Sequence, residues 1–210
     1  MTGQAEAITA ARFALDLAAA SFAGREDVPL ALAEALEARA FGLRVEAQVS
    51  TSAAAVEILA NAAALHRRAS RVTGLPRAVS DRYRAHFFGA ERELEERRSA
   101  DPAKLDASRL RVEKALHKSE SRAADRTSPA EQAAHMAMLA EFAMCFTVEL
   151  KLGSLADNQG KLAQSKRTVE HVTQKTMDLA SKLFMPLDWM LLQRTYAQLQ
   201  RLDTECPDHP

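Results

Sequence analysis

Arginine is the residue type that first suggests chemistry in this chain, since six arginines fall in HRRASRVTGLPRAVSDRYRAHFF, residues 66–88. Guanidinium groups bind phosphate and carboxylate oxygens through paired hydrogen bonds. The glycine and proline of this stretch predict a tight turn between two helices. Arg77, Asp81 and Arg84 then share one face of the second helix, where they could reach base edges and phosphates. One hypothesis is therefore a DNA-binding transcriptional regulator with a helix-turn-helix-like corner at residues 67–88.

Three features of the sequence favour a simpler interpretation of the same corner. The helix before the turn is longer than the first helix of a compact helix-turn-helix unit. Ser80 and Asp81 stand where such a unit would need apolar packing, although Val79 and Tyr83 could partly serve. The acidic run ERELEE replaces the third packing helix. The favoured interpretation is an ordinary helical hairpin, with arginines that are solvated or salt-bridged.

The patterns for metal binding and nucleophilic catalysis are weak. A helical di-metal site needs Glu-x-x-His pairs, but Glu131 and His135, like Glu113 and His117, are spaced four apart. No HExxH or CxxC motif occurs. Cys145 lies among apolar residues in AEFAMCFTVEL, where a thiol packs as an unreactive group. We therefore predict no catalytic residue, no metal and no cofactor, and expect that the protein is not an enzyme.

The composition predicts a helical protein with no strong electrostatic preference. Lys and Arg balance Asp and Glu at 28 each, and apolar residues make up 47% of the chain. Alanine is frequent, whereas Gly and Pro are scarce at seven each, and such a composition favours helices. No signal peptide is evident, and the densest apolar window, MAMLAEFAMCFTVEL, is too short for a membrane span. We expect no membrane span and a cytoplasmic protein.

Glycine, proline and cap residues divide the chain into helices. The motif TSPAEQ, with Ser128 as the cap, Pro129 next and Glu131 as the return partner, is a capping box. A break or a bend is expected near VSTSAAA, since serine and threonine can cap locally. Beyond Gly160 the chain up to Phe184 either continues one helix or begins another. The other predicted helices are 4–22, 29–72, 76–98, 101–125, 129–152 and 186–202.

These signals predict an all-α fold, an elongated up-and-down helical bundle of six or seven helices with a charged helical hairpin in the middle of the chain. We expect one domain over residues 1–210, with the hairpin at 76–126 and the last seven residues frayed. The charged faces of the hairpin, in ERELEERR above all, are expected to be solvated. Leu155, Leu162, Val169, Thr176 and Leu183 lie seven apart, which is coiled-coil-like spacing, and antiparallel packing in a bundle explains it equally well.

Methionine and aromatic side chains suggest association as the function. MAMLAEFAMCF and FMPLDWMLLQRTY are apolar nearly all round, more than a bundle of this size can easily bury. We therefore expect a non-enzymatic scaffold, adaptor or secretion-associated protein that binds a protein partner or itself, as a homo-oligomer. Nucleic acid is the less favoured partner. The residues expected to contact a protein partner are Trp189, Met190, Tyr196, Arg109 and Arg111.

Overall fold

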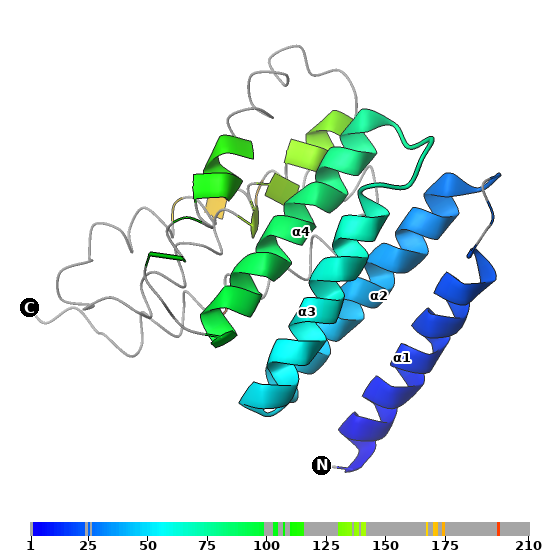
Figure 1. Cartoon of the computed structure of the whole chain (residues 1–210), viewed down its shortest axis with the longest axis vertical. Coiled ribbons are helices and arrows are strands. Elements are labelled where there is room, and N and C mark those ends of the chain that lie inside the picture. The colour runs from blue at the N-terminus through cyan, green and yellow to red at the C-terminus, as the bar shows by residue number, and fades with distance from the viewer. Residues whose placement is uncertain are drawn as a thin grey trace, which may run out of the picture. The chain divides into compact units, whose positions relative to one another are not determined.

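The computed structural model describes residues 2–23, 25, 27–98, 103–104, 107, 110–115, 130–135, 137–138, 140–141, 167, 170–171, 174 and 197 (Figure 1). These residues form helices and the turns between them, and no strand occurs among them, so the all-α prediction is confirmed. None of the described helices combines the length and the hydropathy that a bilayer-spanning segment needs. The chain divides into two compact units, Met1–Ser99 and Ala100–Pro210.

Four helices build the first unit: α1 (Thr2–Ser21), α2 (Pro29–Val49), α3 (Ser52–Ala69) and α4 (Arg77–Arg98). Each helix packs on the next along the chain, and neighbours run in opposite directions (Figure 1). This is up-and-down order. The loop between α1 and α2 and the loop between α3 and α4 therefore lie at the same end of the unit.

Of the break or bend expected near VSTSAAA, the structure has the break, between α2 and α3. Ser50 and Thr51 are extended, with ψ of 159° and 155°, and the Ser50 hydroxyl donates to the carbonyl of Glu46 at 2.8 Å. The single helix predicted over 29–72 is therefore two antiparallel helices. At the other end of α3, Gly74 has φ of 87°, a conformation that side chains with a Cβ rarely adopt. This glycine lets the chain reverse into α4.

Alanine makes most of the core of the first unit. One cluster of buried residues lies near the two loops and another near the opposite end of α2, α3 and α4. Small side chains allow the helices to approach closely. At Gly42, for example, Leu15 Cδ1 of α1 lies 3.0 Å from the position that a Cβ would occupy. The buried residues of the clusters are Ala19, Ala33, Ala35, Leu36, Ala69 and Tyr83 in the first, and Ala47, Ala55, Leu59 and Leu94 in the second.

The α3–α4 pair is a helical hairpin whose helices stay together along their length. Ala69 and Tyr83 share a cluster near the turn, and Leu59 and Leu94 share the cluster at the far end. Val79 and Tyr83 of α4, which the sequence offers as packing residues, both pack in the first cluster. The expectation of solvated charges on ERELEERR is wrong for two residues, since Arg92 and Glu93 are only 2% and 4% exposed.

The second unit contributes shorter described segments. Residues 110–115 are helical, and so are the described residues between 130 and 141. In the latter segment the polar side chains of His135 and Glu141 are buried. The cap Ser128, the residues spaced seven apart from Leu155 to Leu183 and, apart from Ala197, the last predicted helix lie outside the described residues.

Candidate functional site

A pocket of about 850 Å³ opens at the loop end of the first unit. Four arginines line it: Arg25 from the α1–α2 loop, and Arg67, Arg68 and Arg71 from the end of α3 and the turn that follows. The apolar part of the lining comes mainly from Pro29, Leu32, Ala64 and Val72, and Thr73 and Gly74 complete the described wall. The arginine-rich corner between α3 and α4 thus forms one side of a concave site.

Local sequence explains how this corner is held. The Ser70 hydroxyl donates to the carbonyl of Arg67 at 2.8 Å, and the Ser70 amide donates to the carbonyl of His66 at 3.0 Å. The Ser80 hydroxyl then donates to the carbonyl of Ser70 at 2.6 Å, which ties α4 to the end of α3. A Cβ at Gly74 would lie 3.5 Å from Pro29 Cγ, which is an ordinary van der Waals contact, so the turn after α3 lies against the first residue of α2.

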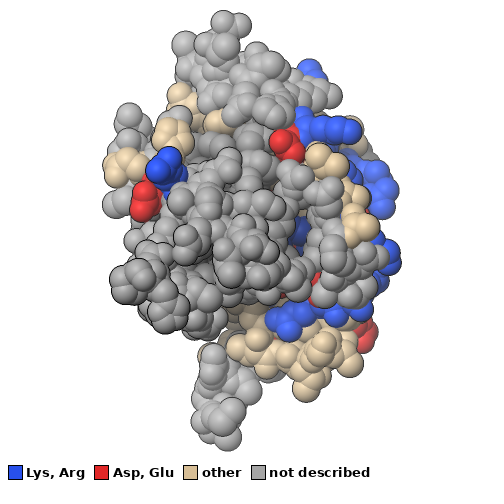
Figure 2. Space-filling model, turned by 90° about the vertical axis from the view of Figure 1, so that its left-hand side faces the viewer, with Lys and Arg blue, Asp and Glu red and all other residues tan. Residues whose placement is uncertain are grey.

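The arginines of the pocket differ in how far their charge is compensated. Arg25 forms two hydrogen bonds to Asp27, at 2.8 and 2.7 Å, and these bonds lower the pKa of Asp27. Arg67 stacks over the Phe87 ring, 5.9 Å from its centroid. In the part of the chain that the structure describes, no carboxylate pairs with Arg67, Arg68 or Arg71. Figure 2 shows Lys and Arg side chains gathered along one edge of the molecule's surface. The corner carries a net positive charge.

The face predicted to read DNA is largely occupied by its own ion pairs. Asp81 accepts a hydrogen bond from Arg84 at 3.1 Å, and its second oxygen lies 4.0 Å from Arg77 Nε. The three side chains do share a face, as the spacing predicts, and the two arginines are exposed. Since α3 and α4 pack side by side, α4 is the second helix of a hairpin. DNA binding by this face stays a prediction.

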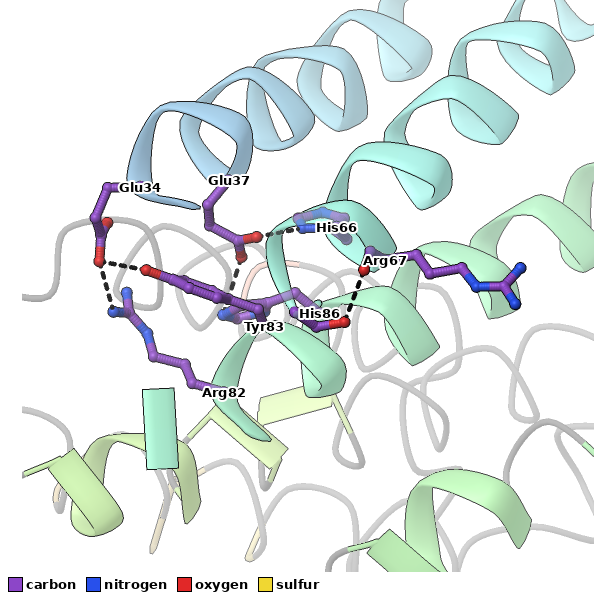
Figure 3. A network of polar contacts seen from close by, with 8 residues as sticks. Glu34, Glu37, His66, Arg67, Arg82, Tyr83 and His86 are labelled. Atoms are coloured by element: carbon purple, nitrogen blue, oxygen red, sulfur yellow. Dashed lines mark hydrogen bonds and ion pairs between the residues drawn. The ribbon is translucent and has the colours of Figure 1, made fainter. Parts of the chain in front are cut away.

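A buried network of polar side chains joins three helices on the other side of α3 (Figure 3). Glu37 of α2 lies between His66 of α3 and His86 of α4, and all three are 0% exposed. One oxygen of Glu37 lies 2.8 Å from His66 Nδ1, and the other lies 3.7 Å from His86 Nε2. Because a carboxylate only accepts hydrogen bonds, Nδ1 of His66 carries the proton of this bond. Arg67 leaves α3 on the side away from this cluster, toward solvent.

Phe41 connects this histidine pair to a buried ion pair. Its ring packs edge-on against His66 and His86, with centroids 5.4 and 4.9 Å apart, and the Arg44 guanidinium lies 5.2 Å above it. Arg44 donates through Nε and Nη2 to one oxygen of Glu93, at 3.1 and 2.5 Å. The Arg44 and Glu93 side chains are 1% and 5% exposed. An ion pair between α2 and α4 is therefore buried.

Burial has a clear effect on the titration of two of these groups. It lowers the pKa of His66 more than the neighbouring Glu37 raises it, so His66 is held neutral. Burial and the 2.6 Å hydrogen bond to Glu34 raise the pKa of Tyr83. Both groups keep their protons fixed at neutral pH and hold helices together. Since the Glu37–His66 pair is fully buried, a substrate has no access to it, and we interpret it as structural.

Most of the partner residues predicted from the sequence cannot be placed. Trp189, Met190, Tyr196 and Arg109 lie outside the described residues, and Arg111 is an exposed helical residue. Within the described part of the chain, no three His, Cys, Asp or Glu side chains are arranged to hold a metal ion. Spacing alone could not find the Glu37–His66–His86 cluster, because its members come from three helices.

The outer face of α1 is apolar and exposed. Phe13 and Leu17 are 70% and 58% exposed, although their spacing of four places them on one stripe of the helix. Ala10, Ala14 and Ala20 are exposed on the same stripe. The opposite face of α1 carries Ala18, Ala19 and Phe22, which pack into the core. The helix thus has one apolar face buried and one facing outward.

Comparison with known proteins adds no functional information. No protein-family model matches the chain, and neither the curated proteins nor the solved structures gave a significant match.

Proposed function

We propose that this protein is a non-enzymatic helical scaffold that associates with a second copy of itself through the outer face of α1. The observation that carries the proposal is the exposure of Phe13 and Leu17, at 70% and 58%, on a helix whose other face is already packed. A helix that is apolar on both sides is normally covered on both sides. Covering these two side chains would contribute roughly 1.5–3 kcal/mol each.

The charges of α1 favour a second copy as the occupant. Arg12 pairs with Glu46 at 3.2 Å, and Asp16 pairs with Arg39, so these two charged side chains are held by α2. From Ala10 to Ala20 the stripe carries no charge and is rich in alanine, which permits close helix approach. In a two-fold antiparallel pairing, Phe13 of each copy would meet Leu17 of the other. An uncharged, self-complementary face of this kind suits an isologous dimer.

The mass in solution, measured by light scattering over a range of concentrations, tests the proposal. We expect a dimer or larger species for the native protein and a monomer for the double variant Phe13→Glu/Leu17→Glu. The matched control is Leu30→Glu, because Leu30 of α2 is also an exposed leucine, at 50%, but lies off α1. A native protein that is monomeric at every concentration would refute the proposal, as would equal dissociation by the control.

The DNA-binding regulator draws less support from the described geometry. Asp81 already engages Arg77 and Arg84, and a hairpin of long helices does not present α4 as a separate reading helix. A gel shift at two salt concentrations tests this second candidate, since binding through phosphates weakens steeply with salt. We expect no specific shift.

A further inference from the structure

We propose that the arginine-lined pocket at the loop end of the first unit binds a small organic polyphosphate, of the class of nucleoside di- and triphosphates. The pocket is formed by Arg25, Arg67, Arg68 and Arg71 with an apolar wall that includes Leu32 and Val72. This site is separate from the association face on α1, so the inference goes beyond the proposed function and does not depend on it.

The charge of the lining selects an anion. No Asp or Glu is among the described residues that line the pocket, whereas four guanidinium groups are. Asp27 compensates Arg25, which leaves Arg67, Arg68 and Arg71 without a carboxylate partner in the described part of the chain. Three such cations call for more than one negative charge. Since the guanidinium fork matches phosphate oxygens, a di- or triphosphate satisfies them best.

The backbone at the pocket edge adds to this preference. Pro29, which lines the pocket, is the first residue of α2, and the cap residue Val28 makes no side-chain hydrogen bond to the helix end. The 21-residue helix therefore brings the positive end of its dipole to the pocket without a competing side-chain acceptor. The last turn of α3 brings the opposite end of a dipole, but Arg67 and Arg68 stand on that turn and offset it.

The shape and the apolar wall select the rest of the ligand. A volume of about 850 Å³ lies within the range of small-molecule sites and exceeds the needs of phosphate groups alone. Pro29, Leu32, Ala64 and Val72 offer an apolar surface next to the guanidinium groups, which suits an aromatic or aliphatic body. A duplex presents its phosphates on a convex surface, so a concave pocket favours a free ligand that can enter it.

Calorimetric titration of the full chain tests this site with three probes: a nucleoside triphosphate, inorganic pyrophosphate and a short DNA duplex. The test variant is Arg67→Gln/Arg68→Gln. The matched control is Arg97→Gln/Arg98→Gln, which removes two exposed arginines from the last turn of α4 just as the test variant removes two from the last turn of α3. Thermal melting of both variants establishes that each is folded.

We expect the nucleoside triphosphate to bind more tightly than pyrophosphate, because only the former reaches the apolar wall. The test variant should raise its Kd by about tenfold or more, and the control should leave it unchanged. Absence of nucleotide binding would overturn the proposal. So would an equal loss in the control variant, binding of pyrophosphate as tight as that of the nucleotide, or binding of the duplex alone.

Discussion

The buried ion pair between Arg44 and Glu93 provides the sharpest test of how the first unit is held together. The change to make is Arg44→Met, which keeps an unbranched side chain as far as the position of Nε and removes the charged guanidinium group. Arg44 is 1% exposed and donates two hydrogen bonds to one oxygen of Glu93, itself 5% exposed, so the substitution removes a buried positive charge from beside a buried carboxylate. We expect the free energy of unfolding to fall by about 3–5 kcal/mol.

This loss is large beside the total stability of a small domain, which is typically about 5–15 kcal/mol. Urea unfolding, followed by circular dichroism, measures it, and the midpoint should fall by roughly 1 M or more. The double variant Arg44→Met/Glu93→Met removes both charges and fills the space with apolar atoms. It should recover more than half of the loss, because the cost lies in the stranded charge rather than in the missing bond.

The exposed pair between Arg12 and Glu46 gives the matched control. It also joins α2 to a neighbouring helix through an arginine and a glutamate, at 3.2 Å, but the Arg12 side chain is 53% exposed. Water replaces such a contact easily, so Arg12→Met should cost at most about 1 kcal/mol. If Arg44→Met costs no more than Arg12→Met, the argument from burial is wrong.

Two further predictions concern the neighbouring features. Burial lowers the pKa of His66 below its ordinary value of 6.5. Below pH 6.5 this histidine therefore binds more protons in the unfolded chain than in the folded one. We expect the free energy of unfolding to fall on acidification by up to about 1.4 kcal/mol per pH unit. Urea titrations between pH 5 and 7 should show a flatter slope for His66→Gln but not for the exposed His171→Gln, and equal slopes would contradict the assignment. Gly74 has φ of 87°, so Gly74→Ala should lower the free energy of unfolding by about 1–2 kcal/mol. Gly74→Asn should lower it by less, since asparagine tolerates this region of backbone conformation. Thermal melting measures both variants, and an alanine variant as stable as the native protein would refute the strain argument.

The helices of the first unit could be predicted from the sequence because their signals are local. Pro29 begins α2, Gly74 ends the turn before α4, and the serine–threonine run marks the break between α2 and α3. Each signal acts on the backbone within a few residues, whatever the rest of the chain does. The packing role of Tyr83 in α4 could also be predicted, and this residue is 0% exposed.

The buried charges could not be predicted in the same way, because their partners are far apart in sequence. Glu37 meets a histidine 29 residues away, and Arg44 meets a glutamate 49 residues away. The one sequence signal is that Glu37 and Arg44, seven apart, fall on the alanine stripe that includes Ala33, Ala40 and Ala47. A charged side chain on an otherwise apolar helix face indicates a buried partner of opposite charge. In ERELEERR, by contrast, the high density of charged residues led to the prediction that all of them are solvated.

The position of these charges suggests why an alanine-rich bundle retains them. Helix faces lined by alanine present small side chains of the same shape at each turn. A shift of one helix along another by one turn would therefore bury nearly the same apolar area. The Glu37–His66 and Arg44–Glu93 contacts close in a single register of α2, α3 and α4, because each needs its partner within hydrogen-bond distance. We infer that the buried pairs specify register rather than add net stability. The same register sets the end of α3 against the start of α2, and it therefore places the arginines of the corner around one pocket.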